Sequence, residues 1–199
     1  MIDNITRSGC GPGEALECPT PNERLLERVT AYTVIAIDPG ANGAIVEYRP
    51  NDSPGLQVSV HKMPDTPKDI YTLLASIQNS SDECVCVIEK VGGYVKGNAV
   101  HCAVTFARHC GHLEMALIAL GIPIVEEVAP KVWQKPLGPF PLVPKRKDYE
   151  SDKAHKAAVD RVKGERKNII KSKMQKRYPS INVTLWNADA LGIATWYMD

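Results

Sequence analysis

Hydrophobic and polar residues divide the chain into segments with strand-like or helix-like patterns. Short β-branched apolar runs bounded by turn residues predict strands, whereas apolar residues three and four positions apart predict helices. The predicted strands are residues 31–37, 43–49, 56–62, 84–89 and 122–128. The predicted helices are residues 22–29, 67–78 and 98–120, a short helix from Pro130, a basic helix from Ser151 to about Arg177 in one or two pieces, and residues 187–197.

The order of these segments predicts an α/β fold of the ribonuclease H type. Three strands in succession, separated by the turn-like DPGAN and PNDSPG, favour a meander. The later strands alternate with helices, which favours crossover connections. We therefore expect a mixed five-stranded sheet with helices on both faces in residues 31–199. Residues 1–21 are polar and rich in Gly and Pro and are expected to be loose, so that residues 1–30, with the short helix at 22–29, form an N-terminal arm.

The net charge of the whole chain hides an uneven distribution of charge between its segments. The 199 residues are enough for one domain, and their formal net charge is +1. Residues 145–177, however, hold 13 Lys or Arg against 5 Asp or Glu, whereas the other residues hold 11 against 18. Such a segment is typical of a solvated face or of contact with nucleic acid. With no apolar run of membrane-spanning length and no secretory signal, we expect a cytoplasmic protein without a membrane partner.

The cysteines are interpreted as reduced thiols, as in other cytosolic proteins. Cys84 and Cys86 lie two apart in an apolar strand, so both are expected on one buried face. Further potential metal ligands fall in one predicted helix: His101, Cys102, His109, Cys110 and His112. Because this group lacks CxxC or HExxH spacing, packing is preferred to a zinc site.

Three acidic residues stand where they would meet at one edge of the sheet. Asp38 ends the first predicted strand and Glu89 the fourth, while Asp189 lies between two alanines in the last helix. Small neighbours allow a helix to approach a sheet closely, and three converging carboxylates are suitable ligands for hard divalent cations. Two such cations can drive phosphodiester hydrolysis. Asp38 also begins a good turn sequence, Asp-Pro-Gly, so a purely structural role for it stays open.

Five blocks of the sequence resemble RuvC-type Holliday-junction resolvases, particularly those of phages and mobile elements. They are VIAIDPGANGAIVEY (34–48), CVIEKVGGY (86–94), ARHCGHLEMALIALGIPIVEEVAPKVWQKPLG (107–138), KAHKAA (153–158) and NADALGIATW (187–196). The resemblance covers about residues 31–198 and implies a homodimeric endodeoxyribonuclease that nicks four-way junctions or related branched DNA with Mg²⁺, for which Mn²⁺ can substitute. It also implies that Asp38, Glu89 and Asp189 are the catalytic and metal-binding residues.

One departure from the family pattern leaves the activity open. The family usually has another acid three residues before the last one, where this chain has Trp186. The next residue, Asn187, offers only a neutral carbonyl oxygen. The alternative is therefore a catalytically weak or inactive resolvase-like module that binds DNA. Sugar-kinase and actin-like proteins also open with a strand and an Asp-x-Gly turn, but they need two such domains and a longer chain.

Seven residues are expected to contact DNA, six of them basic. Three lie in the loop after the second acid, where the family probes the junction, and a tyrosine there could stack on a base or fold back onto the protein. Two flank Trp133, which is itself expected to be packed, and two lie four apart on the basic helix. In chain order they are Lys90, Tyr94, Lys96, Lys131, Lys135, Lys167 and Lys171.

Overall fold

The computed structural model describes residues 32–49, 57–81, 83–92 and 100–199 of the chain, and within them it forms one mixed five-stranded sheet. The strand order is β3-β2-β1-β4-β5, with β1–β2 and β2–β3 antiparallel and β1–β4 and β4–β5 parallel. The strands are β1 (Thr33–Asp38), β2 (Ala44–Arg49), β3 (Gln57–Lys62), β4 (Cys84–Glu89) and β5 (Ile124–Val128).

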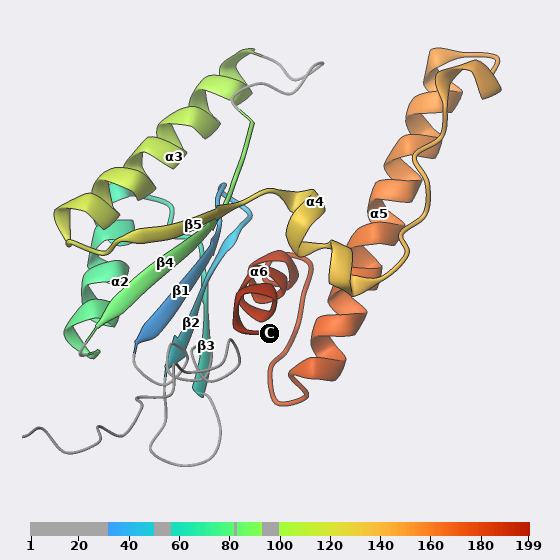
Figure 1. Cartoon of the computed structure of the whole chain (residues 1–199). Coiled ribbons are helices and arrows are strands. Elements are labelled where there is room, and N and C mark those ends of the chain that lie inside the picture. Colours follow the sequence, from blue (N-terminus) through green and yellow to red (C-terminus); the bar gives the residue numbers. More distant parts are fainter. Residues whose placement is uncertain (1–31, 50–56, 82, 93–99) are drawn as a thin grey trace, which may run out of the picture.

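Helices cover both faces of this sheet (Figure 1). On one face lie α2 (Pro67–Asn79) and α3 (Val100–Ala119). On the other lies α6 (Ala188–Met198), with α5 (Asp152–Arg177) outside it, and the short α4 (Pro130–Trp133) follows β5. The strand order and the two covered faces confirm the predicted α/β fold of the ribonuclease H type.

Alternation along the strands separates two hydrophobic cores. In β1, Val34 and Ala36 pack with α6, whereas Ile35 and Ile37 pack with α2 and α3. The same alternation in β4 sends Val85 and Val87 toward α6 and Cys84 and Cys86 toward α2 and α3. Asp38 comes two residues after Ala36, and Glu89 two residues after Val87. Both side chains are therefore directed to the α6 face of the sheet.

Most predicted elements are confirmed to within two residues. The basic segment is one helix that continues through Gly164, which has open space around it, so the option of two pieces is wrong. Cys84 and Cys86 are buried free thiols, as expected, and burial raises the pKa of both. The predicted arm at residues 1–30, with the short helix at 22–29, lies outside the described residues. None of the helices in the described parts has the length and hydrophobicity to cross a membrane.

The N-terminal half of α5 runs away from the sheet together with the segment before it, residues 138–151, here called the strap (Figure 1). Three contacts hold the strap to the helix. The Arg166 guanidinium lies 5.1 Å from the centre of the Phe140 ring, His155 Nε2 lies 3.0 Å from the Pro144 carbonyl oxygen, and Arg146 pairs with Asp152. The Ser151 hydroxyl accepts a hydrogen bond from the Ala154 amide and caps the helix.

Candidate active site

Two carboxylates lie side by side at the carboxyl ends of the paired parallel strands β1 and β4. Ile37 is in register with Ile88, so the next residues, Asp38 and Glu89, occupy equivalent positions on neighbouring strands. Both continue the alternation that faces α6, and both are half-buried. The strand pairing therefore confirms that these two acids meet at one edge of the sheet.

The turn after β1 fixes the backbone at Asp38. A Cβ atom at Gly43 would lie 2.0 Å from the Asp38 carbonyl oxygen, so no side chain can be accommodated there. The Gly43 amide donates to the Gly40 carbonyl at 2.9 Å, and Gly40 has φ +122°, a conformation that favours glycine. The glycines of the Asp-Pro-Gly-Ala-Asn-Gly segment thus serve the tight return into β2. The turn role and the site role of Asp38 are compatible.

The third carboxylate is brought to the same place by α6. Asp189 is in the first turn of this helix, with Ala188 and Ala190 on either side buried. As expected from the small neighbours, α6 packs directly against β1 and β4 in the core. The Asp189 side chain is 18% exposed, so it borders both the core and the solvent.

The three acids are close enough for their charges to interact. Burial raises the pKa of Asp38 well above its ordinary value, and the charges of Asp189 and Glu89 raise it further. Burial is also the main cause that raises the pKa of Glu89 and of Asp189. Each added negative charge is therefore unfavourable in the folded chain without a cation nearby, which is a common feature of functional sites.

Two neighbouring side chains partly offset this cost. Lys167 of α5 places its Nζ 3.9 Å from Asp189 Oδ2, and its charge lowers the pKa of all three acids. The Trp133 indole N–H donates a hydrogen bond of 2.8 Å to Glu89 Oε1 and lowers the pKa of that carboxyl. The sequence predicted Lys167 as a DNA contact and Trp133 as packed; it did not reveal that each touches one of the acids.

The three acids offer carboxylate oxygens, which are the type of ligand that hard divalent cations prefer. As they stand, however, no three His, Cys, Asp or Glu side chains in the described parts of the chain are grouped so that they could hold a metal ion. The side chains of Asp38, Glu89 and Asp189 would have to turn toward a shared ion. In the described parts of the chain, the Lys167 ammonium group is a cation that lies against one of them, Asp189.

Asn187 and Trp186, the two residues before α6, are held by contacts within the protein. Asn187 is buried, its Oδ1 accepts a hydrogen bond of 2.7 Å from the Thr184 amide, and its Nδ2 donates to the Asn182 carbonyl. Trp186 packs against the core on the α6 side of the sheet. Asn187 is therefore not a free ligand, and the acids that the described parts of the chain bring to the site are Asp38, Glu89 and Asp189.

The predicted DNA-contact residues lie at several places around this site. Lys131 and Lys135 are exposed on either side of Trp133, which is 1% exposed and packed as expected. Lys90 follows Glu89 and lies 4.0 Å from Glu127. Lys171 is half-buried one helical turn beyond Lys167. Tyr94 and Lys96 lie outside the described residues.

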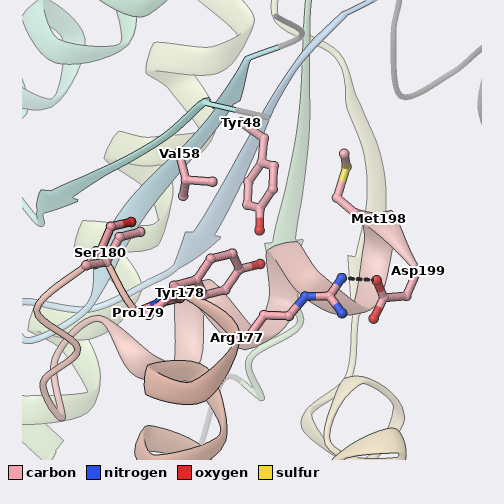
Figure 2. Close-up of a pocket in the computed structure, with 9 residues that line it drawn as sticks. Tyr48, Val58, Arg177, Tyr178, Pro179, Ser180, Met198 and Asp199 are labelled. Carbon is pink, nitrogen blue, oxygen red and sulfur yellow. Dashed lines mark hydrogen bonds and ion pairs between the residues drawn. The ribbon is translucent and has the colours of Figure 1, made fainter. Parts of the chain in front are cut away.

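A pocket of about 340 Å³ is present elsewhere on the α6 face, and Figure 2 shows its lining. Tyr48 and Val58, which are paired in register, form one wall. The Arg177–Asp199 ion pair and the Tyr178 ring form the other (Figure 2). Because Tyr48 pairs with Val34 near the start of β1, the pocket lies toward the opposite end of the sheet from Asp38.

Comparison of the sequence with protein-family models and with curated proteins finds no match. Among solved structures, the chain is similar to RuvC of Thermus thermophilus, with 14% identity and a TM-score of 0.46 over 82% of this chain and 92% of that one. It is also similar to T. thermophilus RuvC in complex with Holliday junction substrate, with 13% identity and a TM-score of 0.46 over 82% and 90%. At so low an identity and TM-score, neither neighbour carries information about the chemistry of this chain.

Proposed function

We propose that this chain is a structure-specific endodeoxyribonuclease of the RuvC type, which nicks four-way junctions or related branched DNA in a Mg²⁺-dependent reaction. The observation that carries the proposal is the meeting of Asp38, Glu89 and Asp189 at one edge of the sheet. The motifs around these acids, IDPG, VIE and NADAL, are those that resemble the resolvases.

The three acids are the proposed ligands of the cation. When bound, Mg²⁺ would supply an activated water and charge stabilisation on the leaving oxygen while a bond forms between that water and phosphorus and one P–O bond to the sugar breaks. Asp38 and Glu89 stand at the ends of two paired strands, so their backbone positions are fixed relative to each other. The raised pKa of all three acids supports this role, because a divalent cation would offset both the cost of burying their charges and the repulsion among them.

The basic helix α5 is the proposed path of the DNA backbone toward the acids. Lys167 lies at the acids and Lys171 lies one turn farther along the same helix, with Lys131 and Lys135 on α4 and after it. Lysines at these positions suit phosphates, which supply position and affinity rather than sequence specificity. A homodimer would present two such sites to the two sides of a junction.

The second candidate is a resolvase-like module that binds branched DNA and cuts it weakly or not at all. It is favoured by two observations, namely Trp186 in place of a further acid and the commitment of Asn187 to its loop. The two candidates differ only in whether the bound strand is cut.

Cleavage by an Asp38→Asn variant tests the proposal. We expect wild-type protein to nick a labelled four-way junction in Mg²⁺ or Mn²⁺, and the variant to bind the same junction with wild-type affinity in metal-free buffer while losing cleavage. Linear duplex and a flap serve as substrate controls, and size-exclusion chromatography with light scattering measures the dimer. Tight junction binding by wild type without nicking in either metal would establish the binding module instead, and undiminished cleavage by the variant would exclude this site.

A further inference from the structure

Trp133 connects two of the three acid-bearing elements. Its indole N–H donates a hydrogen bond of 2.8 Å to Glu89 Oε1 at the end of β4. Its six-membered ring lies against Gly192 of α6, where a Cβ atom would come within 2.6 Å of Cζ3. Gly192 is three residues after Asp189 and so lies about one helical turn away on the same side of the helix. One side chain therefore spans the gap between Glu89 and the helix that carries Asp189.

Packing alone does not account for the polar part of this contact. A Trp133 side chain that is 1% exposed fills space, and a phenylalanine or leucine could fill much of the same space. A buried indole N–H, by contrast, needs an acceptor, and here that acceptor is a carboxylate rather than a backbone carbonyl. The hydrogen bond engages Oε1 and restricts rotation of the carboxylate.

The backbone around Trp133 is placed by the strands themselves. Glu89 is in register with Val128, and the Lys90 amide donates to the Val128 carbonyl at 2.8 Å, so β4 and β5 remain paired up to the site. Pro130 then starts α4 after the extended Ala129, which brings Trp133 back over the strand end within one turn of helix. The contact between residues 44 apart in sequence is thus built by regular elements.

We infer that Trp133 is a positioning residue of the active site, which orients the Glu89 carboxylate by its N–H and sets the distance of α6 by its ring. This inference rests on the proposed function for its effect on cleavage, although the contact itself does not. Partners that orient a metal ligand by a hydrogen bond typically contribute 10- to 100-fold to metal affinity or activity. We expect an effect of that size here.

The first test observes the contact directly and needs neither metal nor DNA. The chain contains three tryptophans, so a ¹⁵N-labelled sample gives three indole N–H resonances, which Trp133→Phe and Trp196→Phe assign. Glu89→Gln replaces a charged acceptor by a neutral one and is expected to move the Trp133 indole proton upfield while the Trp196 resonance stays in place. An unchanged Trp133 resonance in that variant would overturn the inference.

The second test separates positioning from general packing. Trp133→Phe keeps an aromatic ring but lacks the N–H. Trp196→Phe makes the same chemical change in a side chain that packs on the same core but, among the described residues, donates no hydrogen bond to the acids. We expect Trp133→Phe to need roughly 10- to 100-fold more Mg²⁺ for half-maximal junction cleavage, with unchanged metal-free junction binding, and Trp196→Phe to match wild type. Equal Mg²⁺ requirements in Trp133→Phe and wild type would refute the positioning role.

The outcomes distinguish this inference from the proposed function. If wild-type protein does not cleave, the proposed nuclease fails, and calorimetric titration with Mn²⁺ replaces cleavage as the comparison of Trp133→Phe with wild type. If wild type cleaves and both tests give no difference for Trp133, the inference fails while the nuclease stands. If Trp133→Phe does not fold, the indole resonance in Glu89→Gln still decides, because that protein retains the tryptophan and Trp186→Phe and Trp196→Phe assign its resonance by elimination.

Discussion

Asp38→Asn is expected to stabilise the metal-free protein, although it should abolish cleavage. Burial and the charges of Asp189 and Glu89 raise the pKa of Asp38 well above its ordinary value. The ionised carboxylate is therefore destabilising at neutral pH, and an amide of the same shape removes that cost. Removing an unfavourable surface or site charge typically adds about 0.5–2 kcal/mol. At about 2–4 °C per kcal/mol for a chain of this size, the melting temperature should rise by about 1–8 °C.

Mg²⁺ should reverse the order of stability. A ligand that binds only the folded state stabilises it by RT ln(1 + [L]/Kd), or about 2.7 kcal/mol at 100 times Kd. Wild-type protein has all three acids and is expected to gain this stability, whereas the variant lacks one ligand and gains little. The two thermal unfolding curves should therefore exchange their order when MgCl₂ replaces EDTA.

The stability difference between Asp38→Asn and wild type should depend on pH in a direction set by the raised pKa of Asp38. Because the pKa of Asp38 is higher in the folded chain, its destabilisation is present at neutral pH and fades as the pH falls through the folded value, where wild type becomes protonated. The advantage of the variant should shrink accordingly. Asp148→Asn, the same change at an exposed site, is the control and should leave the melting temperature unchanged. A metal-free variant that is less stable than wild type would refute the electrostatic reasoning.

Two further predictions concern other charges of the chain. Lys167→Ala and Lys171→Ala should each weaken metal-free junction binding and reduce the slope of log K against log salt by about 1. Lys68→Ala, in the helix layer on the opposite face of the sheet, is the control and should change neither. Slopes equal to that of wild type would exclude phosphate contacts at Lys167 and Lys171. Arg49→Ala should destabilise the fold by about 1–3 kcal/mol in chemical denaturation at pH 7, because Glu47 is 2% exposed and Arg49 is one of its partners. The pKa of Glu47 is lowered by the bonds from His61 and Arg49 against the effect of burial, so this difference should diminish in acid, and a pH-independent difference would contradict the ion-pair explanation.

The sheet and two of the acids could be predicted because they depend on local patterns. Period-two alternation in β1 and β4 sets which face each residue occupies, and Asp38 and Glu89 are the polar residues at which those apolar patterns end. The third acid followed from its alanine neighbours, which signal a helix that packs tightly. Each of these features can be read within about ten residues of sequence.

The contacts made by Trp133 and Lys167 depend instead on tertiary structure. Trp133 meets Glu89 across 44 residues and Lys167 meets Asp189 across 22, and no spacing rule connects either pair. One signal was available for the first, because a tryptophan expected in the core needs an acceptor for its N–H. The hydrogen bonds of Asn187 to the Thr184 amide and the Asn182 carbonyl were likewise hidden, because they depend on how the loop before α6 closes.

Lys167 connects the two halves of the uneven charge distribution. It belongs to the segment with 13 basic and 5 acidic residues, and it pairs with an acid from the remainder, in which acidic residues predominate. The pair is 3.9 Å long and the lysine side chain is 58% exposed, so it is weak enough to exchange. On the proposed function, a phosphate would compete with Asp189 for the ammonium, and a divalent cation at the acids would take over the neutralisation of Asp189. The same lysine would then serve the acids in the free protein and the DNA in the complex, which explains why a basic helix is packed beside a carboxylate site.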